Sequence, residues 1–267
     1  MNIFLGKVIK LTFIFTLFLQ SFALSIENKI MLKINNQIIT TIDVYQEANY
    51  LKALNPNIQN LDKKKILDIA RSSLIREKIK EIELSKYKKN EIDPKYLEQI
   101  IQSIYTKINL ENKSEFKKYV KNFGIDMEII EKKLQIETRW NQLIYKKFFS
   151  KLKIDKESIR KNIDANREKS ISFLLYEIVF SIDKDNQNNE VFNSIEKSIL
   201  KEGFENAAAI YSISESSKTG GNLGWVNENN INNKILKNVN TLEIGQHTKP
   251  ILIPGGFLIL QLKDKKN

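Results

Sequence analysis

The chain of 267 residues contains no cysteine and a single histidine, His247. Without cysteine there is no disulfide framework, no thiolate nucleophile and no cysteine to carry a lipid after an export signal. One isolated histidine supplies no partner set for acid–base catalysis or for a metal site, so we interpret His247 as a turn or surface residue. Glycine-rich phosphate loops and clustered metal ligands are also missing. We therefore expect no metal and no cofactor.

Long apolar runs are equally scarce, and the one that stands out lies at the N-terminus. Lys7 and Lys10 precede an apolar run over residues 11–22, and Ser21 and Ala23 occupy the −3 and −1 positions that signal peptidase reads. The alternative is a membrane anchor, but the run is shorter than the roughly 20 residues that span a bilayer. We predict a signal peptide over residues 1–23, export to the periplasm and no stable membrane insertion of the mature chain.

The charge is strongly positive but evenly distributed. The formal net charge is +11, which becomes +9 once Lys7 and Lys10 are removed with the signal. Such a balance would permit nucleic-acid binding. However, the lysines alternate with carboxylates, as in residues 77–83, which is typical of solvated helix faces. There is no arginine cluster, zinc spacing or aromatic RNA platform, so we expect no nucleic-acid partner, although a basic surface can attract acidic or membrane-proximal partners.

The first half of the mature chain predicts a hairpin followed by five or so helices. Residues 30–40 form the hairpin, because Asn35 and Asn36 both tolerate the left-handed conformation of a tight turn. Thr40 and Asp43 have the spacing of a capping box, so a helix should begin there. Apolar residues at three- and four-residue steps predict a helix over residues 63–88. Further helices are expected at 94–107, from 114 up to Gly124, at 126–149 and at 155–160.

From about Arg167 the pattern changes to alternating strand and helix signals. Residues 172–181 are β-branched and aromatic, which is typical of a buried central strand. Two helices are expected next, at 191–201 and 204–211, with a stop at Gly203. A loop at Gly220 and Gly221 follows, and residues 256–262 form a closing strand. The chain as a whole is therefore predicted to be α+β.

Three motifs of this second half resemble the parvulin family of peptidyl-prolyl isomerases. They are Gly-Gly-Asn-Leu-Gly-Trp at 220–225, Leu-Glu-Ile-Gly at 242–245 and the run from Lys249 through Gly-Gly-Phe-Leu-Ile-Leu at 255–260. The order of strand, two helices, loop and strand agrees with the small α+β parvulin fold. The resemblance implies a parvulin-like domain over residues 167–267.

Weaker motifs in the first half resemble the N-terminal domain of SurA-type periplasmic chaperones. They occur in a fixed order at residues 34–43, 74–79, 123–126 and 140–143. The resemblance implies a mainly helical, SurA-like chaperone domain over residues 24–166. A generic helical domain is the alternative.

The parvulin resemblance implies an apolar cup that holds a prolyl ring. When the motif is followed from Gly221 without gaps, the proline-cradling positions fall on Leu223, Ile231 and Ile235. These three residues are therefore the predicted substrate-binding residues. The alternative is that they are ordinary core residues, since leucine and isoleucine are common in cores.

The polar floor of the cup departs from the family. The two positions where parvulins keep histidines fall on Glu177 and Leu258, and the position usually held by cysteine or aspartate falls on Ser214. A carboxylate and an apolar side chain cannot reproduce two hydrogen-bonded imidazoles. We assign no catalytic residue, and we expect peptidyl-prolyl isomerase activity (EC 5.2.1.8) to be absent or very weak.

Two other chemistries can be imagined for this region. Ser214 could act as a hydrolase nucleophile, but it has no Gly-x-Ser-x-Gly elbow and no histidine placed to act as its base. Glu177 and Glu215 could form a pair of carboxylates, but no sugar cleft is indicated. Neither chemistry has the partner groups that such sites require.

The SurA resemblance implies an exported, ATP-independent chaperone for unfolded polypeptides, with outer-membrane β-barrel precursors as clients. One alternative is an active isomerase with a diverged floor, and another is a partner-docking module without either activity. Many SurA-type chaperones have a second parvulin domain and a C-terminal helix that packs on the N-terminal domain, and the sequence shows neither. We therefore expect an open apolar groove on the helical domain, available to a client or to a second copy of the chain.

Overall fold

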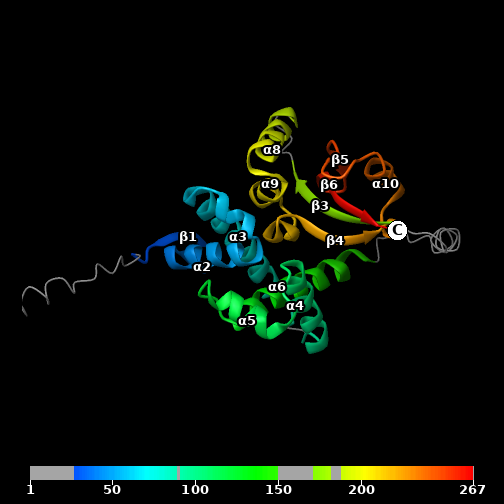
Figure 1. Ribbon diagram of the computed structural model, residues 1–267. Coiled ribbons are helices and arrows are strands. Elements are labelled where there is room, and N and C mark those ends of the chain that lie inside the picture. The colour runs from blue at the N-terminus through cyan, green and yellow to red at the C-terminus, as the bar shows by residue number, and fades with distance from the viewer. Residues whose placement is uncertain (1–26, 89–90, 150–170, 182–187, 267) are drawn as a thin grey trace, which may run out of the picture.

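The computed structural model describes residues 27–88, 91–149, 171–181 and 188–266. A helical part, blue to green in Figure 1, lies beside a sheet-containing part, yellow-green to red. The helices precede the sheet in the chain, so the predicted α+β class is confirmed. The expected signal peptide and the short helix at residues 155–160 lie outside the described residues. None of the described helices has the length and apolar character needed to cross a membrane.

The helical part begins with the predicted hairpin. Strand β1 (Ile30–Ile34) pairs antiparallel with β2 (Gln37–Thr40). Only Asn35 of the turn is left-handed, with φ 49°, so the expectation for Asn36 is wrong. The Thr40 hydroxyl accepts a hydrogen bond from the Asp43 N–H at 3.3 Å, and the Asp43 carboxylate accepts one from the Thr40 N–H at 2.7 Å. This capping box starts helix α2 (Thr41–Leu54).

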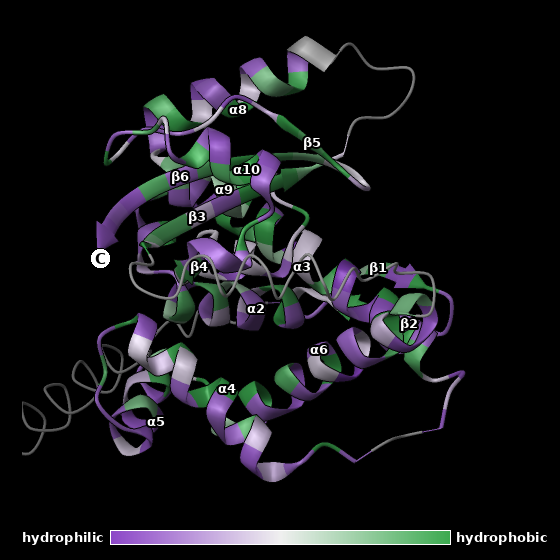
Figure 2. Ribbon diagram, turned by 90° about the vertical axis from the view of Figure 1, so that its right-hand side faces the viewer, coloured by the Kyte–Doolittle hydropathy of each residue, from purple (hydrophilic) through white to green (hydrophobic). Residues whose placement is uncertain are grey.

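The later helices begin where side chains satisfy their first N–H groups. Asp62, Asp93 and Asn112 accept hydrogen bonds from N–H groups of the first turns that follow them. These caps start α3 (Lys63–Leu84), α4 (Pro94–Lys107) and α5 (Lys113–Lys121), and α6 (Met127–Phe148) follows Gly124. Along α2 and α6, hydrophobic and hydrophilic residues alternate (Figure 2), and the hydrophobic ones build the core.

Helix α3 ends four residues before the predicted position. The Ser85 hydroxyl donates to the Ile82 carbonyl, and the next two N–H groups bond three residues back rather than four. The tighter turn satisfies the last carbonyls of the helix and stops it at Leu84.

A buried ion cluster replaces part of the solvated face that was expected for residues 77–83. The Lys133 ammonium lies 2.7 Å from a Glu47 oxygen and 2.5 Å from a Glu77 oxygen, and the Ser73 hydroxyl donates to Glu47 at 2.6 Å. Burial alone would lower the pKa of Lys133, but the two carboxylates outweigh it and raise the pKa to about 12. The prediction of a solvated position is therefore wrong for Glu77, because its partner lies 56 residues away in the chain.

The second part is a four-stranded antiparallel sheet with helices on both sides. Its strands are β3 (Ser172–Phe180), β4 (Asn222–Asn227), β5 (Ile251–Ile253) and β6 (Gly256–Lys266), in the order β4-β3-β6-β5. The strand predicted to be central, β3, indeed pairs on both sides. Strand β4, which follows the expected loop at Gly220 and Gly221, was not predicted.

Each face of the sheet has its own apolar core. Helices α8 (Asn188–Glu202) and α9 (Phe204–Tyr211) lie on one side and α10 (Asn233–Val239) on the other (Figure 1). The α8/α9 side buries Ile178, Phe180 and Ile259 of the sheet. The α10 side buries mostly leucines of β3 and β6, at positions 175, 258, 260 and 262. The two faces follow from the period-two alternation of side chains along each strand.

The two parts meet through a cluster of charged side chains. Lys80 of α3 donates to Glu137 of α6 and to Glu215 of the sheet-containing part, at 2.5 Å each. Lys218 lies 2.5 Å from the same Glu215 and 3.4 Å from Glu137. A separate contact is the donation from Lys107 of α4 to the Asn222 carbonyl of β4. Two carboxylates and two ammonium groups are thus shared across the boundary.

Candidate functional site

A sharp loop places the predicted floor residues next to β3. After α9 the chain runs through Ser212 and Ser214 into a short 3-10 helix (Glu215–Thr219), and then through Gly220 and Gly221 with φ 67° and 82°. The Gly221 carbonyl accepts a hydrogen bond from the Glu177 N–H at 2.8 Å. A Cβ at Gly221 would overlap the Glu177 carbonyl oxygen, so glycine is needed for this close approach.

The loop connects Ser214 to Glu177 through a chain of hydrogen bonds. The Val179 N–H donates to the Ser212 hydroxyl at 3.0 Å, and that oxygen lies 2.9 Å from the Ser214 hydroxyl. Ser214 lies 2.7 Å from the Ser216 hydroxyl, which donates to Glu177 Oε1 at 2.7 Å. Two of the three predicted floor residues, Ser214 and Glu177, are therefore joined in one polar network.

Proton counting fixes the direction of this network. A hydroxyl has one proton, and Ser216 gives its proton to the carboxylate of Glu177. Ser216 then accepts from Ser214, and Ser214 accepts from Ser212. The hydroxyl protons of Ser212, Ser214 and Ser216 are all directed toward Glu177. These three serines therefore offer hydrogen-bond acceptors to a substrate but no free hydroxyl donor.

Leu258, the third predicted floor residue, lies in apolar surroundings. It is 7% exposed on β6, opposite Val179 and Ile251, and belongs to the apolar core on the α10 side. No polar group of the serine chain is bonded to it. The structure therefore separates the two histidine positions of the family into a polar one and an apolar one.

The predicted cup residues are also divided. Ile231 and Ile235 are half-buried and pack against the core that contains Leu258. Leu223 is 37% exposed and lines a hollow of about 380 Å³ between α4 and the loop, together with Tyr96 and Ser216. The structure thus joins Ile231 and Ile235 with Leu258, and it places Leu223 beside the serine chain.

The alternative chemistries find no support in the geometry. Glu215 faces Lys80 and Lys218, and Ser216 rather than Glu215 is bonded to Glu177. His247 is half-buried, with Nε2 at 3.6 Å from a Glu196 oxygen, so it has one carboxylate neighbour. No group of three metal-ligating side chains occurs in the described ranges.

Sequence reasoning missed Ser216. The signal was available in part, because Ser212, Ser214 and Ser216 recur at every second position. In an extended segment this spacing directs hydroxyls to one side. The turn that brings Ser216 onto Glu177 depends on the 3-10 helix and the two glycines, which a local pattern does not reveal.

Comparison with known proteins identifies the C-terminal domain. Residues 176–264 match the family model of the PPIC-type PPIASE domain, also called rotamase. Over 69 residues the chain is 35% identical to the chaperone SurA of Pseudomonas putida, a match that covers 25% of this chain and only 16% of that protein.

Two solved structures are similar. A PpiC-type peptidyl-prolyl cis-trans isomerase domain is 31% identical, with 36% of this chain and 92% of that chain covered and a TM-score of 0.31. A SurA-like chaperone of Campylobacter jejuni is 18% identical, with 89% and 83% covered and a TM-score of 0.32. Residues 176–264 therefore belong to the PPIC-type parvulin family, and a segment of 69 residues is similar to the chaperone SurA, of which this chain matches only a small part.

Proposed function

We propose that the mature chain is an exported, ATP-independent chaperone that holds unfolded polypeptides, including outer-membrane β-barrel precursors, in the periplasm. Its parvulin-type domain is proposed to catalyse the cis-trans isomerisation of prolyl peptide bonds weakly or not at all. The observation that carries the second part is the hydrogen-bond chain from Ser212 to Glu177. The similarity to SurA-type chaperones supports the first part.

The weak isomerase activity follows from what catalysis of this reaction needs. Rotation about a prolyl amide bond requires a twisted state to be stabilised against a barrier of about 18–20 kcal/mol. The hydroxyl protons beside the cup are committed to Glu177, and Leu258 supplies no polar atom. Polar donors that favour the twisted amide over the planar one are therefore lacking at the family positions.

Client holding requires accessible apolar surface. The hollow between α4 and β4 offers the exposed side chains of Tyr96 and Leu223 beside Ile100 and Ile104. A second exposed group lies at the end of α6, at Tyr145 and Phe149. Exposed apolar patches mark interaction sites, so these surfaces are the proposed contacts for clients, and self-association of two copies would use the same groups.

Two assays on the purified mature chain test the proposal. In the first, the chain should delay aggregation of an unfolded outer-membrane protein, and the variants Tyr96→Ser and Leu223→Ser should protect less. Leu200→Ser is the matched control, because Leu200 is 85% exposed on α8, away from the hollow. Equal protection by all three variants would remove the hollow from the proposal, and no protection by the unmodified chain would refute the chaperone function.

The second assay follows a prolyl tetrapeptide in a protease-coupled reaction. The alternative function, an active isomerase, has support from the match to the PPIC-type family. Turnover within about tenfold of an ordinary parvulin, a difference of about 1.4 kcal/mol in barrier, would establish that alternative. Slower turnover combined with protection of the unfolded client is the result expected for the proposed function.

A further inference from the structure

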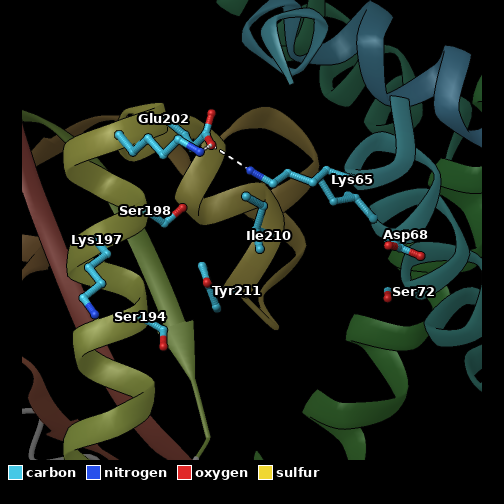
Figure 3. A pocket seen from close by; sticks show the side chains of 11 residues that line it. Lys65, Asp68, Ser72, Ser194, Lys197, Ser198, Glu202, Ile210 and Tyr211 are labelled. Atoms are coloured by element: carbon cyan, nitrogen blue, oxygen red, sulfur yellow. Dashed lines mark hydrogen bonds and ion pairs between the residues drawn. The ribbon is translucent and has the colours of Figure 1, made fainter. Parts of the chain in front are cut away.

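A second hollow, unrelated to the parvulin cup, lies between the two parts of the molecule. It has a volume of about 440 Å³ and is walled by α3 on one side and by α8 and α9 on the other (Figure 3). Its apolar lining comes from Ile69 of α3 and from Ile210 and the ring of Tyr211 of α9. We refer to it as the α3–α8 pocket. Its size is that of ordinary ligand sites, about 300–1,000 Å³.

The charges around the α3–α8 pocket are mostly positive. Three lysines line it, at positions 65, 197 and 201, against two carboxylates, Asp68 and Glu202. The carboxylates are already engaged: Asp68 pairs with Arg71 at 3.1 Å, and Glu202 pairs with Lys65 at 2.7 Å, the dashed contact in Figure 3. Among the described residues no carboxylate lies within ion-pair distance of Lys197. Lys201 lies 3.5 Å from the same Glu202, so within the part of the chain that the structure describes Lys197 is the pocket ammonium group without a counter-charge.

Ser198 adds an unsatisfied polar atom. It is only 9% exposed, and its hydroxyl has no hydrogen-bond partner within the part of the chain that the structure describes. Figure 3 shows its oxygen directed from α8 into the space that faces Lys65 and Ile210. Leaving a buried hydroxyl without a hydrogen-bond partner costs stability. A ligand oxygen that accepts from Ser198 recovers this cost.

We propose that the α3–α8 pocket binds an acidic segment of an unfolded polypeptide, in which an aliphatic or aromatic side chain stands next to a carboxylate. The proposal depends on the proposed chaperone function and specifies a class of client for it. The apolar side chain contacts Ile69, Ile210 and the Tyr211 ring. The neighbouring carboxylate pairs with Lys197 and accepts a hydrogen bond from Ser198.

The pocket favours a peptide over a small anion for two reasons. Its walls are largely apolar, and a bare anion would leave that surface in contact with water. Lys65 and Lys201 both lie within ion-pair distance of Glu202, so among the described residues Lys197 is the lining ammonium group without an ion pair, and one such group matches one carboxylate rather than a doubly charged phosphate. Because α3 and α8 belong to different parts of the molecule, a bound segment would also hold the two parts together.

Two labelled peptides that differ in one residue test the proposal on the full mature chain. One carries Phe-Glu at its centre, the other carries Phe-Gln, and affinity is measured by fluorescence anisotropy at low salt. The Glu peptide should bind more tightly, by about threefold to tenfold, because one partly exposed ion pair and one hydrogen bond distinguish the two. Lys197→Gln and Ser198→Ala should each remove most of this difference and leave the affinity for the Gln peptide unchanged.

Lys234→Gln is the matched control, since Lys234 lies on α10, on the other side of the sheet. Ser198→Ala removes an unpartnered hydroxyl and keeps the helix, and thermal unfolding verifies that this variant is folded. Equal affinities for the two peptides, or equal effects of Lys197→Gln and Lys234→Gln, would overturn the proposal. Competition by inorganic phosphate at concentrations comparable to the Glu peptide would overturn it too, because the site would then be a simple anion site.

The aggregation assay separates this proposal from the proposed function. If the mature chain protects an unfolded client but shows no preference for the Glu peptide, the pocket assignment fails and the chaperone function stands. A Lys197-dependent preference without any protection has the opposite meaning: the pocket binds acidic peptides, and the proposed function is wrong.

Discussion

Leu258 and Glu177 lie on neighbouring strands, yet their surroundings differ in kind. The carboxylate of Glu177 accepts a hydrogen bond from Ser216, whereas Leu258 packs among apolar residues such as Ile251 and Leu260. The contacts that the structure gives Leu258 are apolar, with Val179 and Ile251 opposite it on the two neighbouring strands. The apolar replacement at this residue is therefore matched by the packing around it.

This packing predicts the outcome of restoring the family residue. Leu258→His should lower the free energy of unfolding by about 2–3 kcal/mol at pH 7.5, because the buried ring leaves its polar atoms without partners. Burial should also lower the pKa of the new histidine below its usual value of about 6.5. The unfolded chain then binds more protons than the folded one, so the loss should grow as the pH falls toward 5.

Urea unfolding at the two pH values measures this, with Leu258→Met as the control. A volume-conserving apolar exchange costs less than about 1.5 kcal/mol and adds no titrating group. If both variants lose the same stability and neither depends on pH, the surroundings of position 258 are more polar than the structure indicates.

At the scale of elements, the register of β4 on β3 depends on the two glycines before it. Gly221 has φ 82°, and a Cβ there would overlap the Glu177 carbonyl oxygen. Gly221→Ala should therefore destabilise the protein by about 3 kcal/mol or more, since both the backbone conformation and the overlap with main-chain atoms oppose it. To relieve the overlap, the loop would have to move away from β3, and this movement would separate Ser216 from Glu177.

Gly245→Ala provides the control for backbone strain alone. Gly245 has φ 93°, but a Cβ there would meet no atom within 4 Å, so a loss of about 1–2 kcal/mol is expected. Urea unfolding, together with the yield of soluble protein, compares the two variants. Similar losses would indicate that the close approach to Glu177 contributes nothing.

The elements that sequence reasoning located are those specified by local chemistry. The capping box of Thr40 and Asp43 and the glycine at 124 mark helix ends within a few residues. Strand β4 escaped prediction because Gly224 and two asparagines weaken its strand signal, and pairing with β3 holds it instead. The serine chain and the Lys133 cluster escaped for a related reason, because their partners lie far apart in the sequence.

At the scale of the molecule, the charged cluster between the two parts decides how firmly they are joined. Glu137 is largely removed from water and lies beside Glu215, and these two causes raise its pKa to about 7. Burial alone would raise the pKa of Glu215 as well, but its contact with Glu137 and the charges of Lys218 and Lys80 lower it. One proton shared by two carboxylates is the pattern expected when like charges lie close together.

Removing Lys80 should make the contact between the parts sensitive to pH. In Lys80→Gln the ammonium that lies between Glu137 and Glu215 is lost, and we expect the free energy of unfolding to fall by about 1–3 kcal/mol at pH 8, where both carboxylates are charged.

The pKa of Glu137 in the folded chain lies above its ordinary value of 4.5. The folded parent chain therefore binds more protons than the unfolded chain between about pH 4.5 and 7. Because the Lys80 hydrogen bond lowers the pKa of Glu137, this pKa should be higher still in Lys80→Gln, and the variant should gain more stability than the parent as the pH falls through 7. The loss should be clearly smaller at pH 5.5. Urea unfolding at both pH values measures it, and Lys78→Gln is the control, because the ion pair of Lys78 among the described residues is with Glu81 of its own helix. A loss that is equal at both pH values, or the same pH profile for Lys78→Gln, would show that the cluster does not join the two parts.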